Sequence, residues 1–307
     1  METQLDLFLD GRDAFLVHDV TTGLVARDRR RAETGLERLR DEHPLHPDLP
    51  ALALLVEALG SPPTAPASHT TMTAGTEELR HRLAPAARRL LGEGAAAFLE
   101  PLWQALARQA ADLAFDEAYP LAHRSWLCRQ YGDWAAVRAA VEAAPDWPAS
   151  PRLRYRLGLA RYHLGEADAA IRLWLPLCWT DPGFFARRAP TLPSTTLREG
   201  WEAFERAAPY EESLAETGDA TGWFPAWLLL RHRGLARLFR ADEIPDTGVA
   251  SRVFRHLLAL LPLESQGLSD ALIAGRRALR QLSPSFFGSY MDVVARTGAR
   301  PPRPSSS

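Results

Sequence analysis

The feature that most constrains the fold is the stretch of residues 152–182, in which two apolar stripes with helical spacing flank Gly165. Apolar residues that recur every three to four positions predict amphipathic helices, and a glycine between two such runs predicts a turn. The second run ends at Asp181-Pro182, where the proline disfavours further helix. The stretch therefore predicts a helical hairpin. The chain shows no convincing alternation of apolar and polar residues of the kind typical of strands, so we expect an all-α fold.

The small and apolar residues of this stretch resemble those of a tetratricopeptide repeat (TPR), a helical hairpin of 34 residues. The resemblance rests on Leu157, Gly158, Ala160, Gly165, Ala170, Ile171, Trp174 and the Asp181-Pro182 end. A partial match covers residues 121–147, whose turn residue Gly132 lies 33 positions before Gly165. A degenerate match covers residues 13–46, with Ala32, Leu36 and Leu39 on its second helix. The resemblance implies TPR-like hairpins stacked into a right-handed α-solenoid.

The predicted organisation has five parts. Residues 1–59 form an N-terminal helical segment, and residues 60–76, rich in Pro, Ser, Thr and Ala, form a flexible linker or loop. Residues 77–182 hold the helical, TPR-like repeats. Beyond them we expect a helical region without repeats (183–300) and a disordered tail (301–307).

Two prolines are expected to disturb helices within the repeat segment. Pro85 predicts a kink in the helix that opens at residue 76, and Pro176 predicts a kink in the second helix of the best repeat. Pro176 also departs from the TPR pattern. The regular repeat is therefore expected to end near residue 182.

The composition excludes several kinds of chemistry. The chain has no Lys and no Asn, so all 36 basic residues are Arg, a bias typical of a GC-rich and probably bacterial genome. Without lysine there is no P-loop or Schiff-base lysine. Two cysteines, Cys128 and Cys178, are too few for a disulfide framework or a Cys-rich zinc site. We expect no cofactor.

Charge and hydropathy bear on partners and location. The formal net charge of -2 gives no basic excess that would attract nucleic acid, and the arginine runs have acids between them, as solvated helix faces do. The sequence shows no signal peptide and no apolar run long enough to span a bilayer. We therefore expect a cytoplasmic protein that neither binds nucleic acid nor inserts into a membrane.

Catalytic and metal-binding motifs are weak. His43 and His46, flanked by Asp41 and Asp48, are the one cluster of metal-capable side chains, but HPLHPDLP is better explained as a turn between helices. No Gly-x-Ser-x-Gly motif occurs. The sequence thus predicts no catalytic residue and no metal site.

The candidate binding residues lie on the first helix of the best repeat. Their spacing puts five side chains on one face: Arg152, Tyr155, Leu159, Tyr162 and His163. In the TPR family this face lines a concave groove that binds partner peptides, so the resemblance implies a partner-binding site here. A second candidate is the aromatic set Trp223, Phe224 and Trp227, which is either an anchor for a partner or ligand, or hydrophobic core.

Three hypotheses follow. The first is a non-enzymatic TPR-like adaptor or scaffold that binds a protein or peptide. The second is an enzyme or small-molecule sensor with a pocket between the repeats and the aromatic region at 223–227. The third is a structural subunit of a larger assembly, which the sequence does not distinguish from the first.

Overall fold

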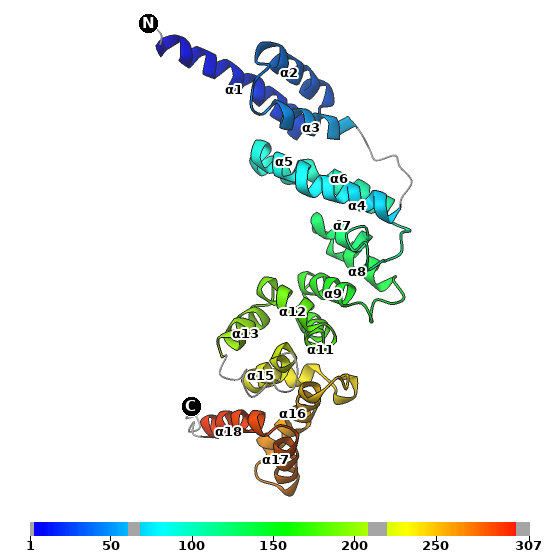
Figure 1. Ribbon diagram of the computed structural model, residues 1–307, viewed down its shortest axis with the longest axis vertical. Helices are drawn as coiled ribbons and strands as arrows, with labels where there is room; N and C mark the ends of the chain where they lie inside the picture. Colours follow the sequence, from blue (N-terminus) through cyan, green and yellow to red (C-terminus); the bar gives the residue numbers. More distant parts are fainter. Residues whose placement is uncertain (1–2, 61–67, 208–219, 299–307) are drawn as a thin grey trace, which may run out of the picture. The chain divides into compact units, whose positions relative to one another are not determined.

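The structure, a computed structural model, describes residues 3–60, 68–207 and 220–298, with side chains described between residues 13 and 296. Every regular element in these ranges is helical, which confirms the all-α prediction (Figure 1). The chain divides into two compact units, residues 1–144 and 145–307. The boundary falls inside the segment 77–182 that was expected to be one run of repeats. The predicted tail, 301–307, lies outside the described residues.

The first unit begins with a hairpin and a third helix that packs against both of its members. These are α1 (Thr3–Val25), α2 (Arg29–Glu42) and α3 (Leu49–Gly60). A long helical stretch follows, made of α4 (His69–Glu78), the π-helical turn η1 (Leu79–Leu83) and α5 (Ala84–Leu91). The short 3-10 turn η2 (Gly92–Gly94) leads into α6 (Ala95–Gln109), and the unit ends with the hairpin α7 (Arg124–Gln130) and α8 (Trp134–Glu142).

The segment predicted to be a flexible linker, residues 60–76, contains the start of α4. Residues 61–67 lie outside the described ranges. At Ser68 the side chain accepts a hydrogen bond from the backbone N–H of Thr71 (3.1 Å), and the Thr71 hydroxyl accepts one from the Ser68 N–H (3.0 Å). This reciprocal capping box fixes the start of the helix, and Met72 is buried one turn later. The linker prediction was wrong for residues 69–76, because composition alone does not reveal a cap followed by a buried methionine.

Pro85 changes the helix geometry, as the sequence predicted, but by a π-helical turn. Proline has no N–H to donate to the carbonyl four residues before it, and its ring crowds that carbonyl. One residue earlier, the N–H of Ala84 bonds to the carbonyl of Leu79, five positions back. The helix thus widens for one turn at residues 79–83 and then continues as α5.

The second unit opens with a hairpin and three short helices: α9 (Pro151–His163), α10 (Ala167–Trp174), α11 (Leu177–Thr180), α12 (Pro182–Arg188) and η3 (Ala189–Thr191). The remaining described elements are α13 (Thr195–Arg206), η6 (Ala220–Trp223), α15 (Phe224–Arg231), η7 (Arg233–Leu238), η8 (Ala241–Glu243), α16 (Val249–Gln266), α17 (Asp270–Leu282) and α18 (Pro284–Gly298). At Pro176 the sequence predicted a kink, whereas the structure has two helices: α10 ends at Trp174, and Pro176 is the N-cap residue of α11.

Three helix pairs, α1–α2, α7–α8 and α9–α10, share one turn geometry. In each turn one residue is left-handed and directly precedes the N-cap residue of the second helix: Arg27 (φ 55°), Gly132 (φ 76°) and Gly165 (φ 86°). The N–H of the N-cap residue bonds to the carbonyl five positions back: Asp28 to Gly23 (2.8 Å), Asp133 to Cys128 (3.2 Å) and Glu166 to Arg161 (2.8 Å).

A second hydrogen bond, from the left-handed residue to the carbonyl three positions back, completes the Schellman arrangement in all three turns. Glycine suits this conformation because it has no Cβ, and the first hairpin uses Arg27 instead. The predicted turns at Gly132 and Gly165 are confirmed. The TPR assignment and the right-handed solenoid that it implies stay predictions.

Candidate functional site

The five residues predicted to line a concave groove do not form an open face. Tyr155 and Leu159 are each only 4% exposed, Tyr162 is half-buried, and Arg152 and His163 are exposed. Burial of Tyr155 and Leu159 contradicts the expectation that these two side chains are accessible, and partner binding by the other three stays a prediction.

The reason lies in what surrounds Tyr155. Its ring meets the ring of Phe184 edge-on, at 5.6 Å between centroids, and lies 6.5 Å from that of Trp174. The Arg188 guanidinium lies 5.7 Å from the Tyr155 centroid. A contiguous run of α9 from residue 155 to residue 160 is buried, and it includes the charged side chain of Arg156. Buried positions therefore occur on every side of this part of the helix, and no single face of it is left open for binding.

The two helices of this hairpin approach each other closely at Gly158. A Cβ on Gly158 would lie 2.7 Å from Cε2 and 2.8 Å from Cδ1 of Trp174. The Trp174 Nε1 donates a hydrogen bond to the backbone carbonyl of Tyr155 (3.1 Å). The missing side chain at position 158 therefore lets a fully buried indole lie against the backbone of α9.

The second candidate, Trp223, Phe224 and Trp227, belongs to the hydrophobic core. These side chains are 2%, 0% and 4% exposed. Phe224 lies against Phe185 and Trp201, with ring centroids 5.7 and 5.2 Å away. The core interpretation is confirmed, and the aromatic-anchor interpretation was wrong because neighbouring helices cover these rings.

A cavity of about 280 Å³ between α10 and residues 239–244 bears on the hypothesis of an enzyme or sensor pocket. It is lined by Arg161, Ala169, Arg172, Leu173, Pro176, Phe239, Glu243 and Ile244. The aromatic residues of the second candidate are absent from that lining.

The HPLHPDLP segment is a turn, as predicted. His46 Nδ1 accepts a hydrogen bond from the Asp48 N–H (3.1 Å), and the Asp48 carboxylate binds Arg89. His46 Nε2 lies 3.9 Å from Asp13. Within residues 3–60, 68–207 and 220–298, no three His, Cys, Asp or Glu side chains gather in a way that could hold a metal ion.

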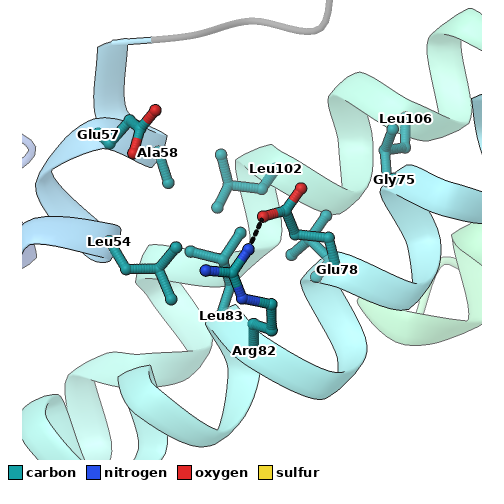
Figure 2. Close-up of a pocket in the computed structure, with 10 residues that line it drawn as sticks. Leu54, Glu57, Ala58, Gly75, Glu78, Arg82, Leu83, Leu102 and Leu106 are labelled. Carbon is teal, nitrogen blue, oxygen red and sulfur yellow. Dashed lines mark hydrogen bonds and ion pairs between the residues drawn. The ribbon is translucent and has the colours of Figure 1, made fainter. Parts of the chain in front are cut away.

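A groove in the first unit has a mostly apolar lining, and we call it the apolar groove. It has a volume of about 320 Å³ and lies between α3, the α4–η1 stretch and α6. Its apolar lining is Leu54, Ala58, Gly75, Leu79, Leu83, Leu102 and Leu106, and its charged lining is Glu57, Glu78 and Arg82. Figure 2 shows Leu54 and Ala58 on one side and Leu83 and Leu102 on the other.

Local sequence explains the shape of the apolar groove. The Ser68 capping box and the π turn before Pro85 together fix where residues 75–83 face. Gly75 has no side chain, and a Cβ there would lie 3.4 Å from Leu106 Cδ2, so the glycine keeps that end of the groove open. Arg82 donates to Glu78 at 2.8 Å beside the leucines (Figure 2).

Charge is unevenly distributed along the edge of the apolar groove. Glu78 and Arg82 neutralise each other, whereas Glu57 is exposed and has no ion-pair partner among the described residues. No sequence pattern predicts this site, because leucines four residues apart, such as Leu79 and Leu83, are typical of the inward face of any helix. Only the approach of α3 and α6 turns that face into a groove.

No protein-family model, curated protein sequence or solved structure matches this chain. The resemblance of residues 152–182 to a TPR therefore rests on the residues alone. Among the described helices, none combines the length and apolar character needed to cross a bilayer.

Proposed function

We propose that this chain is a non-enzymatic helical adaptor that binds an amphipathic helix of a partner protein in the apolar groove. The observation that carries the proposal is the leucine-lined groove of about 320 Å³ between α3, α4–η1 and α6. Its lining carries leucines and an internally paired Glu78–Arg82, not a nucleophile beside a general base. Such a lining binds apolar groups and offers no acid–base chemistry.

A helical occupant fits the walls of the apolar groove better than an extended one. The walls are helices, whose backbone groups are already hydrogen-bonded within each helix, and the inner side chains are leucines. An extended peptide would bury its N–H and C=O groups without partners, whereas a helix satisfies its own. The occupant is therefore a helix with apolar residues at i, i+4 and i+7.

Charge complementarity at the edge specifies the occupant further. Glu57 is exposed at the α3 side of the groove without an ion-pair partner among the described residues. A Lys or Arg beside the apolar stripe of the partner helix would pair with it, and such a rim charge affects recognition and association rate.

Selection from a displayed library of amphipathic helical peptides tests the proposal. We expect selected peptides to carry the i, i+4, i+7 apolar pattern with an adjacent basic residue. Leu102→Glu should weaken their binding by about tenfold or more, because it puts a charge into the groove. The measurement is fluorescence anisotropy with labelled peptides.

The matched control is Ala97→Glu, which adds the same charge at an exposed position of the same helix, outside the groove lining. Circular dichroism confirms that both variants keep their helices. If the selected peptides bind the Leu102→Glu variant as tightly as they bind the wild type, or if no peptide with the apolar pattern is enriched, the apolar groove is not the binding site.

A further inference from the structure

A second groove lies in the first unit, lined by η1, α5, η2, α6 and the end of α7, and we call it the cationic groove. Its volume is about 760 Å³. Its charged and polar lining is Arg80, His81, Arg88, Glu93, Glu100, Gln130 and Tyr131, and the rest is Ala84, Gly92, Ala95, Ala96, Leu99 and Trp103. It shares the helix of residues 79–91 with the apolar groove but none of its lining residues.

The arginines of this helix fall into two groups. Arg82 and Arg89 are bound to carboxylates, Glu78 and Asp48 respectively. Arg80 and Arg88, by contrast, line the cationic groove, are exposed, and have no carboxylate within ion-pair distance among the described residues. The Arg80 guanidinium lies 5.9 Å from the centroid of the Trp126 ring, a cation–π contact that leaves its N–H groups free to donate. Each of the two guanidinium groups can bind a carboxylate through two parallel hydrogen bonds.

The floor of the cationic groove is apolar and aromatic. Leu99 and Trp103 lie four residues apart on α6 and so share one face. Trp103 meets Trp126 edge-on at 5.8 Å, which holds the indole in place. The Tyr131 hydroxyl donates to Cys128 Sγ (3.2 Å). Burial and this hydrogen bond raise the pKa of Tyr131 above its ordinary value, so it adds no negative charge at neutral pH.

We propose that the cationic groove binds the acidic face of a partner helix, with two carboxylates two helical turns apart that pair with Arg80 and Arg88. The two arginines are eight residues apart in a stretch that begins with the π-helical turn, which is about two helical turns, on the order of 10 Å along the helix axis. A helix lying alongside places Glu or Asp at i and i+7 or i+8 over the same distance, and an apolar residue midway between them faces Leu99 and Trp103.

The acids in the groove favour a protein over a nucleic acid as the ligand. Glu93 and Glu100 line the same space as the two arginines, so the formal charge of the whole lining is zero with His81 neutral, and the positive charge is confined to the side that carries Arg80 and Arg88. A phosphate backbone carries a charge at every nucleotide and would place some of them against these glutamates. A peptide can put neutral side chains there. The overall formal charge of -2 likewise supplies no general attraction for polyanions.

A labelled Ala-rich peptide of about 18 residues, with Glu residues two turns apart and Leu midway, is the probe for fluorescence anisotropy with the full chain. We expect saturable binding that weakens when both Glu are replaced by Gln. Arg80→Gln with Arg88→Gln should weaken binding by about tenfold or more, the effect of losing two charge-assisted hydrogen-bonded pairs. Glu93→Gln should strengthen binding, because it removes a like charge.

The control double variant, Arg38→Gln with Arg108→Gln, changes the net charge equally at two exposed arginines outside the groove. Equal weakening by both double variants would reduce the effect to general electrostatics and overturn the proposal. So would failure of the probe to bind at about 1 mM, the scale of very weak affinity. A single-stranded oligonucleotide is tested in the same assay. If it binds more tightly than the peptide, and if the Arg80→Gln with Arg88→Gln variant no longer binds it, the groove is a nucleic-acid site and the proposal is overturned.

Discussion

The contact between Gly158 and Trp174 gives the sharpest test of the packing described above. In Gly158→Ala the new Cβ would lie 2.7 and 2.8 Å from indole carbon atoms, closer than packed atoms approach, so the fully buried Trp174 must shift. Overpacking of this kind costs about 1–3 kcal/mol. Moving the indole also weakens its 3.1 Å hydrogen bond to the Tyr155 carbonyl, at about 1 kcal/mol. Alanine regains about 1 kcal/mol over glycine in a helix interior.

The expected net destabilisation by Gly158→Ala is therefore about 2 kcal/mol, or a fall in Tm of about 4–8 °C for a unit of this size. Thermal unfolding followed by circular dichroism and tryptophan fluorescence measures it. Gly288→Ala is the matched control: it lies in α18, is exposed, and a Cβ there would meet nothing within 4 Å. That variant should gain up to about 1 kcal/mol from helix propensity alone.

A double-mutant cycle separates the contact from other effects. Trp174→Phe removes the Nε1 atom, so Gly158→Ala should cost about 1 kcal/mol less in that background than in the wild type. Two results would contradict this reasoning. One is a Tm raised by Gly158→Ala, as expected for Gly288→Ala. The other is an equal loss of stability from Gly158→Ala in the wild-type and Trp174→Phe backgrounds, because contact with the indole would then not be the reason that residue 158 must be glycine.

Three further predictions concern the turn, an ion pair and the core. Gly165→Ala should destabilise by about 1–2 kcal/mol in urea unfolding through its left-handed φ of 86° alone, because nothing lies within 4 Å of a Cβ there; a neutral result would contradict the turn geometry. Arg276→Ala should cost about 3 kcal/mol, because it strands the Glu264 carboxylate, which is 8% exposed. Arg237→Ala, which removes an exposed ion pair, should cost less than about 1 kcal/mol, and equal costs would refute the comparison. Trp227→Ala should destabilise the protein by about 3–5 kcal/mol in thermal unfolding, as expected for a buried core aromatic residue. An unchanged Tm would contradict a core role for Trp227 and favour the partner-anchor interpretation.

Local signals in the sequence were sufficient for the secondary structure and several turns. The turns at Gly132 and Gly165 follow from glycine's access to left-handed backbone. The π-helical turn before Pro85 and the end of α10 before Pro176 both follow from proline's missing N–H. The segment 69–76 was missed because its helix depends on the side-chain cap at Ser68 and on burial of Met72, which residue composition does not express.

The functional site was harder to predict, because it depends on which helices meet. Tyr155 and Leu159 have the spacing of a single helix face, and both lie on α9 as expected. They are nevertheless buried, and the Tyr155 ring packs against that of Phe184. Leu79 and Leu83 are buried, and they form the inner wall of a groove because α3 and α6 approach the same helix.

The sequence by itself determined an all-helical chain, the hairpin turns and the residue that lets Trp174 approach α9, since periodicity, glycine and proline act over a few neighbouring residues. Only the tertiary structure decided which apolar faces stay open. Exposure depends on side chains that come from distant parts of the chain, such as Leu54 and Leu106 at the apolar groove, or Arg80 and Tyr131 at the cationic groove. A pattern within a few neighbouring residues does not predict which distant side chains come into contact.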